Sequence, residues 1–207
     1  MPMNSHEKEA VRAAALRRRS ALGPECAAAA SRTAQANLIG LPEFEAAGTV
    51  CCYLAMRGEV ETGAVIDACL RAGKRVLVPA WDPRRCEYGL ARLDASVRVA
   101  AGRAGVPEPV APEWVWAGPD LFVVPGVAFD ACGVRLGRGG GHYDRLLSSP
   151  CAAAAFRAGL AFQCQIVDRV PAGARDVPMD AVVTEAGIYR RQAINNGIAA
   201  AARLQGG

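Results

Sequence analysis

A glycine-rich segment at residues 125–145, PGVAFDACGVRLGRGGGHYDR, constrains the fold of this 207-residue chain more than any other part of it. The apolar run that leads into it, DLFVVPG, is typical of a buried strand, and HYDRLL at its end is typical of a helix start. Glycines allow backbone N–H groups to close around an anion without clashes from Cβ atoms. Arg135 and Arg138 can each donate two parallel hydrogen bonds to phosphate oxygens. The segment therefore predicts a phosphate-binding loop between a strand and a helix.

This loop differs from the commoner phosphate-binding motifs. A Walker A loop needs a lysine, and the segment contains none. A dinucleotide-binding fingerprint needs the spacing G-x-G-x-x-G, which Gly137-Arg-Gly139-Gly-Gly141-His does not have. A flexible surface loop is the simplest alternative, but such linkers are rich in serine. Here apolar residues such as Phe129 and Leu136 alternate with the glycines, which favours an anchored loop.

The same segment resembles the signature of the 5-formyltetrahydrofolate cyclo-ligase family, whose members are also called methenyltetrahydrofolate synthetases. That family typically reads PG-V/L-A-F-D-x-x-G-x-R-L-G-x-G-x-G-x-Y-D, and the chain matches it from Pro125 to Asp144. Three further pieces follow in family order: Lys8-x-x-x-Arg12, YLAMRGEVET at 53–62 and VPMDAVVTE at 177–185. The resemblance implies an ATP-dependent cyclisation of 5-formyltetrahydrofolate to 5,10-methenyltetrahydrofolate, with release of ADP and phosphate.

The order of the predicted elements indicates an α/β fold. Alternating strands and helices predict a mostly parallel sheet covered by helices. The resemblance implies that residues 1–207 form a single three-layer domain of the NagB/RpiA/CoA-transferase-like type, with a C-terminal tail from about residue 191. Helices are expected at 5–20, 24–40, 63–72 and from 142, and strands at 49–55, 75–81, 88–93, 121–124, 158–162, 181–184 and 187–190.

Composition argues against several other classes of protein. No apolar run approaches the roughly 20 residues of a membrane-spanning helix, and the first residues do not resemble a secretory signal. The eight cysteines form no C-x-x-C pair and there are only two histidines, which favours reduced core thiols over a zinc site. The net charge of +4 is mild, and Arg17-Arg18-Arg19 is the one basic cluster. We therefore expect a cytoplasmic enzyme without nucleic-acid or membrane partners.

An ATP site assembled from two distant segments is implied by the resemblance. Lys8 and Arg12 are four residues apart on a predicted helix and share one face, which is also compatible with two ordinary surface cations. In the family this pair contacts the ATP phosphates. Arg17–Arg19 is either a solvated helix face or a positive lip above the nucleotide or a polyglutamate tail. The loop residues expected to bind ATP are Arg135, Leu136, Gly137, Arg138, Gly139, Gly140, Gly141, His142 and Tyr143, with Arg135 and Arg138 as the catalytic cations.

The folate is expected at the loop that follows the strand at 49–55. Ligands of open α/β sheets bind at the carboxyl ends of the strands, and Glu59 lies in such a loop. The resemblance implies that Glu59 accepts hydrogen bonds from the pterin ring, whereas a solvated loop glutamate is the alternative. Trp81 is equally compatible with stacking on a ring and with a core position. The further folate contacts are Leu54, Met56, Arg138 and His142.

Asp144 and Asp180 are the predicted magnesium ligands. Mg²⁺ is commonly held by one or two carboxylates together with substrate phosphates. Asp144 follows the phosphate loop directly, although it is also placed to cap the next helix, and Asp180 opens the segment DAVVTE. The expected ligands are therefore ATP, Mg²⁺ and 5-formyltetrahydrofolate or its polyglutamylated forms.

Two positions depart from the family pattern, and two other functions stay open. Many members have Tyr at the position of His142. Some have Lys at the position of Gly140, and because this cation is missing here, Arg138 has to neutralise more phosphate charge. Another phosphate-ester enzyme on the same fold, such as a sugar-phosphate isomerase, would not need the Lys8-x-x-x-Arg12 pair. A non-catalytic nucleotide-binding relative would be expected to lack Glu59, Arg138 or Asp144.

Overall fold

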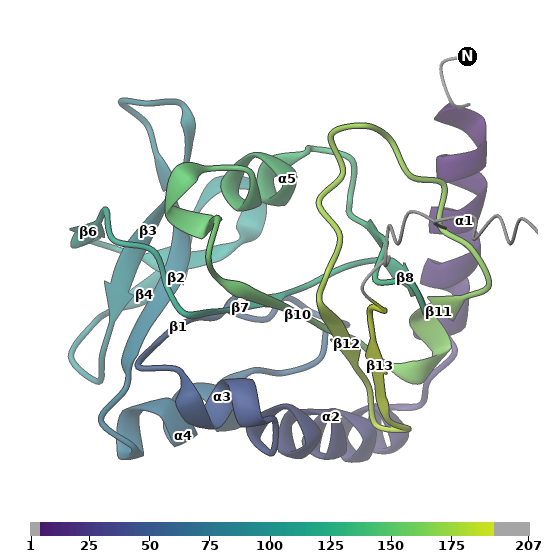
Figure 1. Ribbon diagram of the computed structural model, residues 1–207, viewed down its shortest axis with the longest axis horizontal. Helices are drawn as coiled ribbons and strands as arrows, with labels where there is room; N and C mark the ends of the chain where they lie inside the picture. Colours follow the sequence, from purple (N-terminus) through teal and green to yellow (C-terminus); the bar gives the residue numbers. More distant parts are fainter. Residues whose placement is uncertain (1–4, 193–207) are drawn as a thin grey trace, which may run out of the picture.

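The computed structural model describes residues 5–192, which are built around an eight-stranded sheet (Figure 1). The strand order is β13-β12-β10-β7-β1-β2-β3-β6. The neighbouring strands from β12 to β2 are parallel, and β13, β3 and β6 are antiparallel to their neighbours. This confirms the mostly parallel sheet. The strands are β1 (Thr49–Cys51), β2 (Arg75–Asp82), β3 (Glu87–Leu93), β6 (Trp114–Val115), β7 (Leu121–Val124), β10 (Phe156–Leu160), β12 (Ala181–Val183) and β13 (Ile188–Arg190).

Helices cover the two faces of this sheet. In Figure 1, α2 (Pro24–Ile39), α3 (Pro42–Ala46) and α4 (Gly63–Arg71) lie along the lower face, and α5 (His142–Leu147) lies on the opposite side. Alternate residues of β1 therefore enter different cores. Val50 packs in the cluster that contains residues of α2 and α4, whereas Cys51 packs in the cluster that contains Leu146 and Leu147. Burial on both faces explains why the parallel strands are mostly apolar.

The N-terminal helix α1 (Ser5–Ser20) packs against a second, three-stranded sheet. Its strands are β8 (Ala128–Asp130), β9 (Arg135–Leu136) and β11 (Ile166–Val167), in the order β11-β8-β9. Ala15 of α1 shares a buried cluster with Val127 and Leu136. Because β9 leads directly into the glycine-rich loop, this packing places α1 beside that loop, and Arg12 of α1 contacts Gly137. Figure 1 shows α1 next to β8 and β11.

Most element boundaries agree with those predicted, with a few differences. The strand predicted over 49–55 ends at Cys51, where the chain leaves the sheet as the loop that carries Glu59. The segment between β3 and β7, for which no strand was predicted, contains a hairpin of β4 (Val99–Ala101) and β5 (Pro107–Pro109), a 3-10 turn η1 (Arg103–Gly105) between them, and β6. Two further 3-10 turns are η2 (Pro150–Ala152) and η3 (Gln163–Gln165).

The prediction of reduced core thiols is confirmed in part, and the tail cannot be compared. All eight cysteines are free thiols, but only Cys51, Cys52 and Cys69 are buried, and three others are exposed: Cys26, Cys86 and Cys132. Within residues 5–192, no helix combines the length and the apolar character needed to cross a bilayer. Apart from residues 191 and 192, the tail predicted from about residue 191 lies outside the described residues.

Candidate active site

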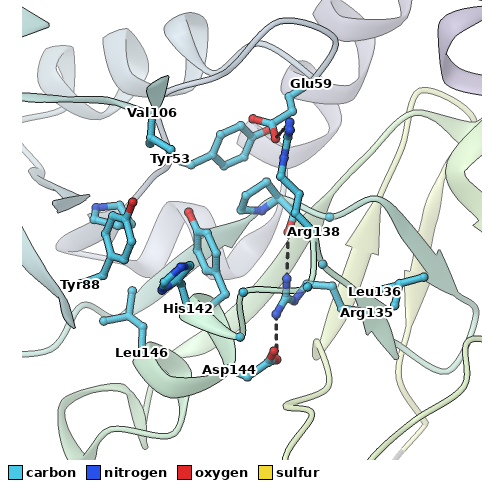
Figure 2. Close-up of a pocket in the computed structure, with 18 of the residues that line it drawn as sticks. Tyr53, Glu59, Tyr88, Val106, Arg135, Leu136, Arg138, His142, Asp144 and Leu146 are labelled. Atoms are coloured by element: carbon cyan, nitrogen blue, oxygen red, sulfur yellow. Dashed lines mark hydrogen bonds and ion pairs between the residues drawn. The ribbon is translucent and has the colours of Figure 1, made fainter. Parts of the chain in front are cut away.

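A cavity of about 710 Å³ opens at the carboxyl ends of β1, β2 and β7 (Figure 2). Its wall is assembled from α1, the loop after β1, strand β3, the glycine-rich loop, α5 and the segment 173–176. This is the edge at which open α/β sheets bind ligands. The predicted site residues that line the cavity are Lys8, Arg12, Leu54, Met56, Glu59 and all residues from Arg135 to Asp144.

The glycine-rich loop has a backbone conformation that favours glycine at two positions. Gly139 has a φ of +105° and Gly141 a φ of +63°, both in the left-handed region. Gly141 is the N-cap residue of α5, so the loop turns directly into the helix. Because Asp144 lies inside α5 and no side chain caps this helix end, the alternative that Asp144 is the helix cap is wrong.

Arg135 is the buried cation of the loop. Its side chain is 4% exposed, and its Nη2 donates a hydrogen bond of 2.7 Å to Oδ1 of Asp144 (Figure 2). Its guanidinium lies over the ring of Tyr143, with the guanidinium carbon 5.5 Å from the ring centroid. Such burial leaves Arg135 little access to a ligand, so its direct effect is to hold Asp144 at the cavity.

Arg138 is the accessible cation of the loop. Its side chain is 54% exposed, and its Nη2 donates a hydrogen bond of 2.9 Å to Oε1 of Glu59. The other oxygen of Glu59 accepts a hydrogen bond of 3.0 Å from the backbone N–H of Met56. Arg19 lies close by: burial lowers its pKa, while Glu59 raises it and Arg138 lowers it. A residue predicted to bind the folate, Glu59, thus pairs in the cavity with a residue predicted to bind ATP, Arg138.

The two cations of α1 dock this helix onto the rest of the site. Nζ of Lys8 lies 2.5 Å from Oδ2 of Asp176, and Nε of Arg12 donates a hydrogen bond of 3.1 Å to the carbonyl oxygen of Gly137. Arg12 also pairs with Glu9. Sequence reasoning assigned no role to Asp176, because no local motif links it to a helix 168 residues away.

Aromatic side chains form another part of the wall. Tyr53 is buried and donates a hydrogen bond of 2.7 Å to the carbonyl oxygen of Val60. The ring of Tyr88 lies edge-on to His142, with the centroids 5.0 Å apart (Figure 2). The antiparallel register pairs Trp81 of β2 with Tyr88 of β3, and it is Tyr88 that lines the cavity. Tyr53 and Tyr88 were missed because nothing in their local sequence distinguishes them from core aromatics.

Trp81 does not line the cavity; its ring packs edge-on against Tyr88, which does. Their ring centroids are 5.4 Å apart, and the guanidinium carbon of Arg103 lies 3.8 Å from the centroid of the Trp81 ring. Trp81 is therefore not placed to stack directly on a ligand ring in the cavity, which was one of the two expectations. Trp81 supports Tyr88, which takes the position at the wall.

Asp180 also lies away from the cavity. Its Oδ2 accepts a hydrogen bond of 2.8 Å from the backbone N–H of Arg157, at the start of β10. Since β10 and β12 are parallel and Asp180 precedes β12, it lies at the amino edge of the sheet, opposite the site. The expectation that Asp180 joins Asp144 is corrected accordingly: Asp180 ties two strands together. Among the described residues, no group of three or more His, Cys, Asp or Glu side chains could hold a metal by itself.

The sequence is similar to one family of known proteins. Residues 4–185 match the model of the 5-formyltetrahydrofolate cyclo-ligase family. The chain is 33% identical over 176 residues to the 5-formyltetrahydrofolate cyclo-ligase of Escherichia coli K12, covering 83% of this chain and 97% of that one. It is 34% identical over 142 residues to the enzyme of the same name from Mycolicibacterium smegmatis, covering 66% and 73% of the two chains.

Solved structures agree. The 5,10-methenyltetrahydrofolate synthetase of Aquifex aeolicus superposes with a TM-score of 0.78 at 34% identity, over 90% of this chain and 93% of that one. The 5,10-methenyltetrahydrofolate synthetase of Mycoplasma pneumoniae shares the fold, with a TM-score of 0.67 at 21% identity over 86% and 99% of the two chains. With its glycine-rich loop at the carboxyl edge of a mostly parallel sheet, the chain belongs to the 5-formyltetrahydrofolate cyclo-ligase family.

Proposed function

We propose that the cavity binds ATP and 5-formyltetrahydrofolate side by side and that the enzyme converts the folate to 5,10-methenyltetrahydrofolate, with release of ADP and phosphate. The observation that carries this proposal is the 2.9 Å contact between Glu59 and Arg138. A carboxylate suited to a pterin and a guanidinium suited to phosphate lie next to each other there. The reaction requires that adjacency, because the folate oxygen has to meet the transferred phosphoryl group.

The chemistry needs activation of an oxygen. The N5-formyl group is an amide, and its oxygen is a poor leaving group. Attack of that oxygen on the γ-phosphorus breaks the bond to ADP and gives an imidoyl phosphate. The lone pair of N10 then forms a bond to the formyl carbon, N10 loses its proton, and the C–O bond breaks as phosphate departs. No protein nucleophile is required, so the protein acts by positioning and charge neutralisation.

We assign the phosphates of ATP to the cations and N–H groups along the loop. Arg138 is exposed enough to reach a ligand, whereas Arg135 acts on the site by holding Asp144. Lys8 and Arg12 line the same cavity from α1. A triphosphate would compete with the carboxylates that now pair with these cations, and it offers more charge and more acceptor oxygens than any one of them.

We assign the folate to the part of the cavity that carries Glu59. Its carboxylate is 10% exposed and already oriented by the backbone N–H of Met56, so little rearrangement is needed before it accepts hydrogen bonds from a pterin. Tyr53, Leu54 and Tyr88 provide apolar and aromatic surface for the ring.

We assign the magnesium ion to Asp144. Asp144 is the carboxylate that fits the ion, because Oδ1 holds Arg135 and no hydrogen bond to Oδ2 is formed by the described residues. One carboxylate together with substrate phosphates is a common Mg²⁺ site, and a bound ion would neutralise phosphate charge. A cytoplasmic location, the use of polyglutamylated substrates, and the absence of nucleic-acid and membrane partners remain predictions from the sequence.

The test is the absorbance of the methenyl product. Purified protein is mixed with 5-formyltetrahydrofolate, Mg²⁺ and ATP, and the same mixture without ATP is the control. Growth of the methenyl chromophore that requires ATP would support the proposal. If calorimetry shows that ATP binds but no chromophore forms, the chain is a different phosphoryl-transfer enzyme or a non-catalytic relative.

A further inference from the structure

His142 is held by an arginine of its own helix. Nη2 of Arg145 lies 2.8 Å from Nδ1 of His142 and also donates a hydrogen bond of 3.0 Å to the carbonyl oxygen of Gly140. A guanidinium has five N–H donors and no acceptor. Nδ1 must therefore be the acceptor in this contact and carries no proton. In a neutral imidazole the single proton then lies on Nε2.

The Nε2 edge of the ring is the one left for a ligand. His142 lines the cavity, and within residues 5–192 no hydrogen bond to its Nε2 is formed. A Cβ atom at position 140 would lie 2.7 Å from Cδ2 and 2.8 Å from Nε2, so glycine at this position leaves room for the ring. Tyr88 and Trp81 stand edge-on to the imidazole at 5.0 and 6.2 Å between centroids, which limits its movement.

The contact with Arg145 requires a neutral ring, and the surroundings of the ring agree with it. Burial lowers the pKa of His142, and the positive charges of Arg145 in α5 and Arg103 in η1 lower it further. Tyr88 of β3 and Trp81 of β2 are the neutral groups packed against it. Protonation would place a hydrogen on Nδ1 and abolish its contact with Arg145, so the contact and the neutral ring support each other.

We propose that Arg145 is a positioning residue that fixes His142 as the Nε2–H tautomer, so that His142 donates a hydrogen bond to a ligand oxygen and does not act as a base. The acceptor is an anionic phosphate oxygen of the nucleotide or the formyl oxygen of the folate. The identity of the ligand rests on the proposed function, whereas the tautomer is a property of the protein alone.

Nitrogen NMR of the ¹⁵N-labelled protein tests the tautomer without turnover. The chain has only His6 and His142, so His142→Phe assigns the signals. We expect an unprotonated Nδ1 and a protonated Nε2 in the wild type at neutral pH. Arg145→Met should allow the proton to occupy Nδ1, whereas Arg145→Lys should retain the wild-type tautomer. Arg71→Met removes an exposed positive charge from α4 and is the matched control.

Two results would overturn the proposal. One is a wild-type His142 with its proton on Nδ1. The other is an Arg145→Met variant, folded by circular dichroism, in which the tautomer of His142 is unchanged. If Arg145→Met does not fold, the wild type and Arg145→Lys still decide the tautomer.

The same spectra distinguish the two acceptors and separate this inference from the proposed function. ATP alone should shift the Nε2 resonance if a phosphate oxygen accepts the hydrogen bond, and 5-formyltetrahydrofolate alone should shift it if the formyl oxygen does. Binding of both ligands without any shift would contradict the donor role. In turnover, Arg145→Met should lower kcat about tenfold, the effect of one average hydrogen bond, and should have no further effect in a His142→Phe background.

Discussion

Glu59 and Arg138 are 79 residues apart in the sequence and form an ion pair of 2.9 Å inside the cavity. The same relationship recurs around the site, because each of the other predicted phosphate-binding cations also has a carboxylate partner. The pairs are Lys8 with Asp176, Arg12 with Glu9, and Arg135 with Asp144. The pairs of Lys8, Arg12 and Arg138 are partly exposed and stabilise a protein by only about 0–1 kcal/mol each, so a polyanion can replace the carboxylate at low cost. The pair of the buried Arg135 with Asp144 is the exception. The cations are thereby oriented before the ligand arrives.

Arg138→Ala should lower kcat by a factor on the order of 10²–10³, as expected when a donor to the transferred group is lost. Because Arg138 is half exposed, loss of its pair with Glu59 should change the stability by no more than about 1 kcal/mol. Methenyl absorbance and thermal unfolding measure the two effects. Arg92→Ala is the control, since Arg92 is 53% exposed, pairs with Asp94 and does not line the cavity. A near-normal kcat in Arg138→Ala would rule out its role in phosphoryl transfer.

Glu59→Gln should weaken binding of 5-formyltetrahydrofolate far more than binding of ATP. A hydrogen bond to a charged group is worth about 1.5–3 kcal/mol, so the dissociation constant for the folate should rise roughly 10- to 150-fold. Calorimetric titration with each ligand separately measures this. Glu61→Gln, an exposed neighbour that does not line the cavity, should change neither affinity. Equal losses for the two ligands would contradict the assignment.

Asp144→Ala should destabilise the fold by about 3 kcal/mol. The change leaves the buried guanidinium of Arg135 without its carboxylate, and breaking a buried pair from one side is costly. The lower end of the usual range applies because Asp144 is 23% exposed. Chemical denaturation gives the free energy of unfolding. Glu87→Ala breaks the exposed pair with Arg85 and should cost less than about 1 kcal/mol; a similar loss in both variants would show that burial of Arg135 is not the cause.

Stability should fall on acidification as His142 becomes protonated. Its pKa is lower in the folded than in the unfolded protein, so between the two values the unfolded state binds more protons. The free energy of unfolding therefore decreases as the pH falls below the pKa of His142 in the unfolded protein, about 6.5, towards its lower pKa in the folded protein. Urea denaturation across this window should give a steeper pH dependence for the wild type than for His142→Gln. Identical slopes would mean that His142 is not held neutral.

Gly140→Ala should displace the ring of His142. The new methyl group would lie within 2.8 Å of two ring atoms, so the imidazole would have to leave its contact with Arg145. We expect kcat to fall by about as much as in His142→Ala, roughly tenfold. The double variant should be no slower than His142→Ala, because the clash is then absent. Additive losses would show that Gly140 acts on the site independently of the ring.

Part of the site could be predicted because its determinants are local. The apolar run 121–124 followed by glycines with positive φ specifies a strand and a loop, and the loop after β1 must lie at the same sheet edge since both strands are parallel. The displacement of Asp180 was also predictable in principle. It opens β12 and does not follow it, so in a parallel sheet it lies at the opposite edge. For Lys8 and Arg12, the spacing was compatible with a phosphate-binding pair and with two ordinary surface cations. Only the family resemblance favoured the first.

The sequence by itself determined the class of fold, the glycine-rich loop and the family, because apolar patterning, glycine positions and a long motif are properties of contiguous residues. The tertiary structure decided which carboxylate partners each cation, that Tyr88 and not Trp81 lines the cavity, and which nitrogen of His142 contacts Arg145. The pairing of Lys8 with Asp176 depends on the docking of α1 against elements more than 100 residues away, and that of Arg138 with Glu59 depends on two loops meeting at one sheet edge. The position of Tyr88 depends on the β2–β3 register, and the contact of His142 with Arg145 on one turn of α5. These are consequences of packing between distant elements, and local spacing does not specify them.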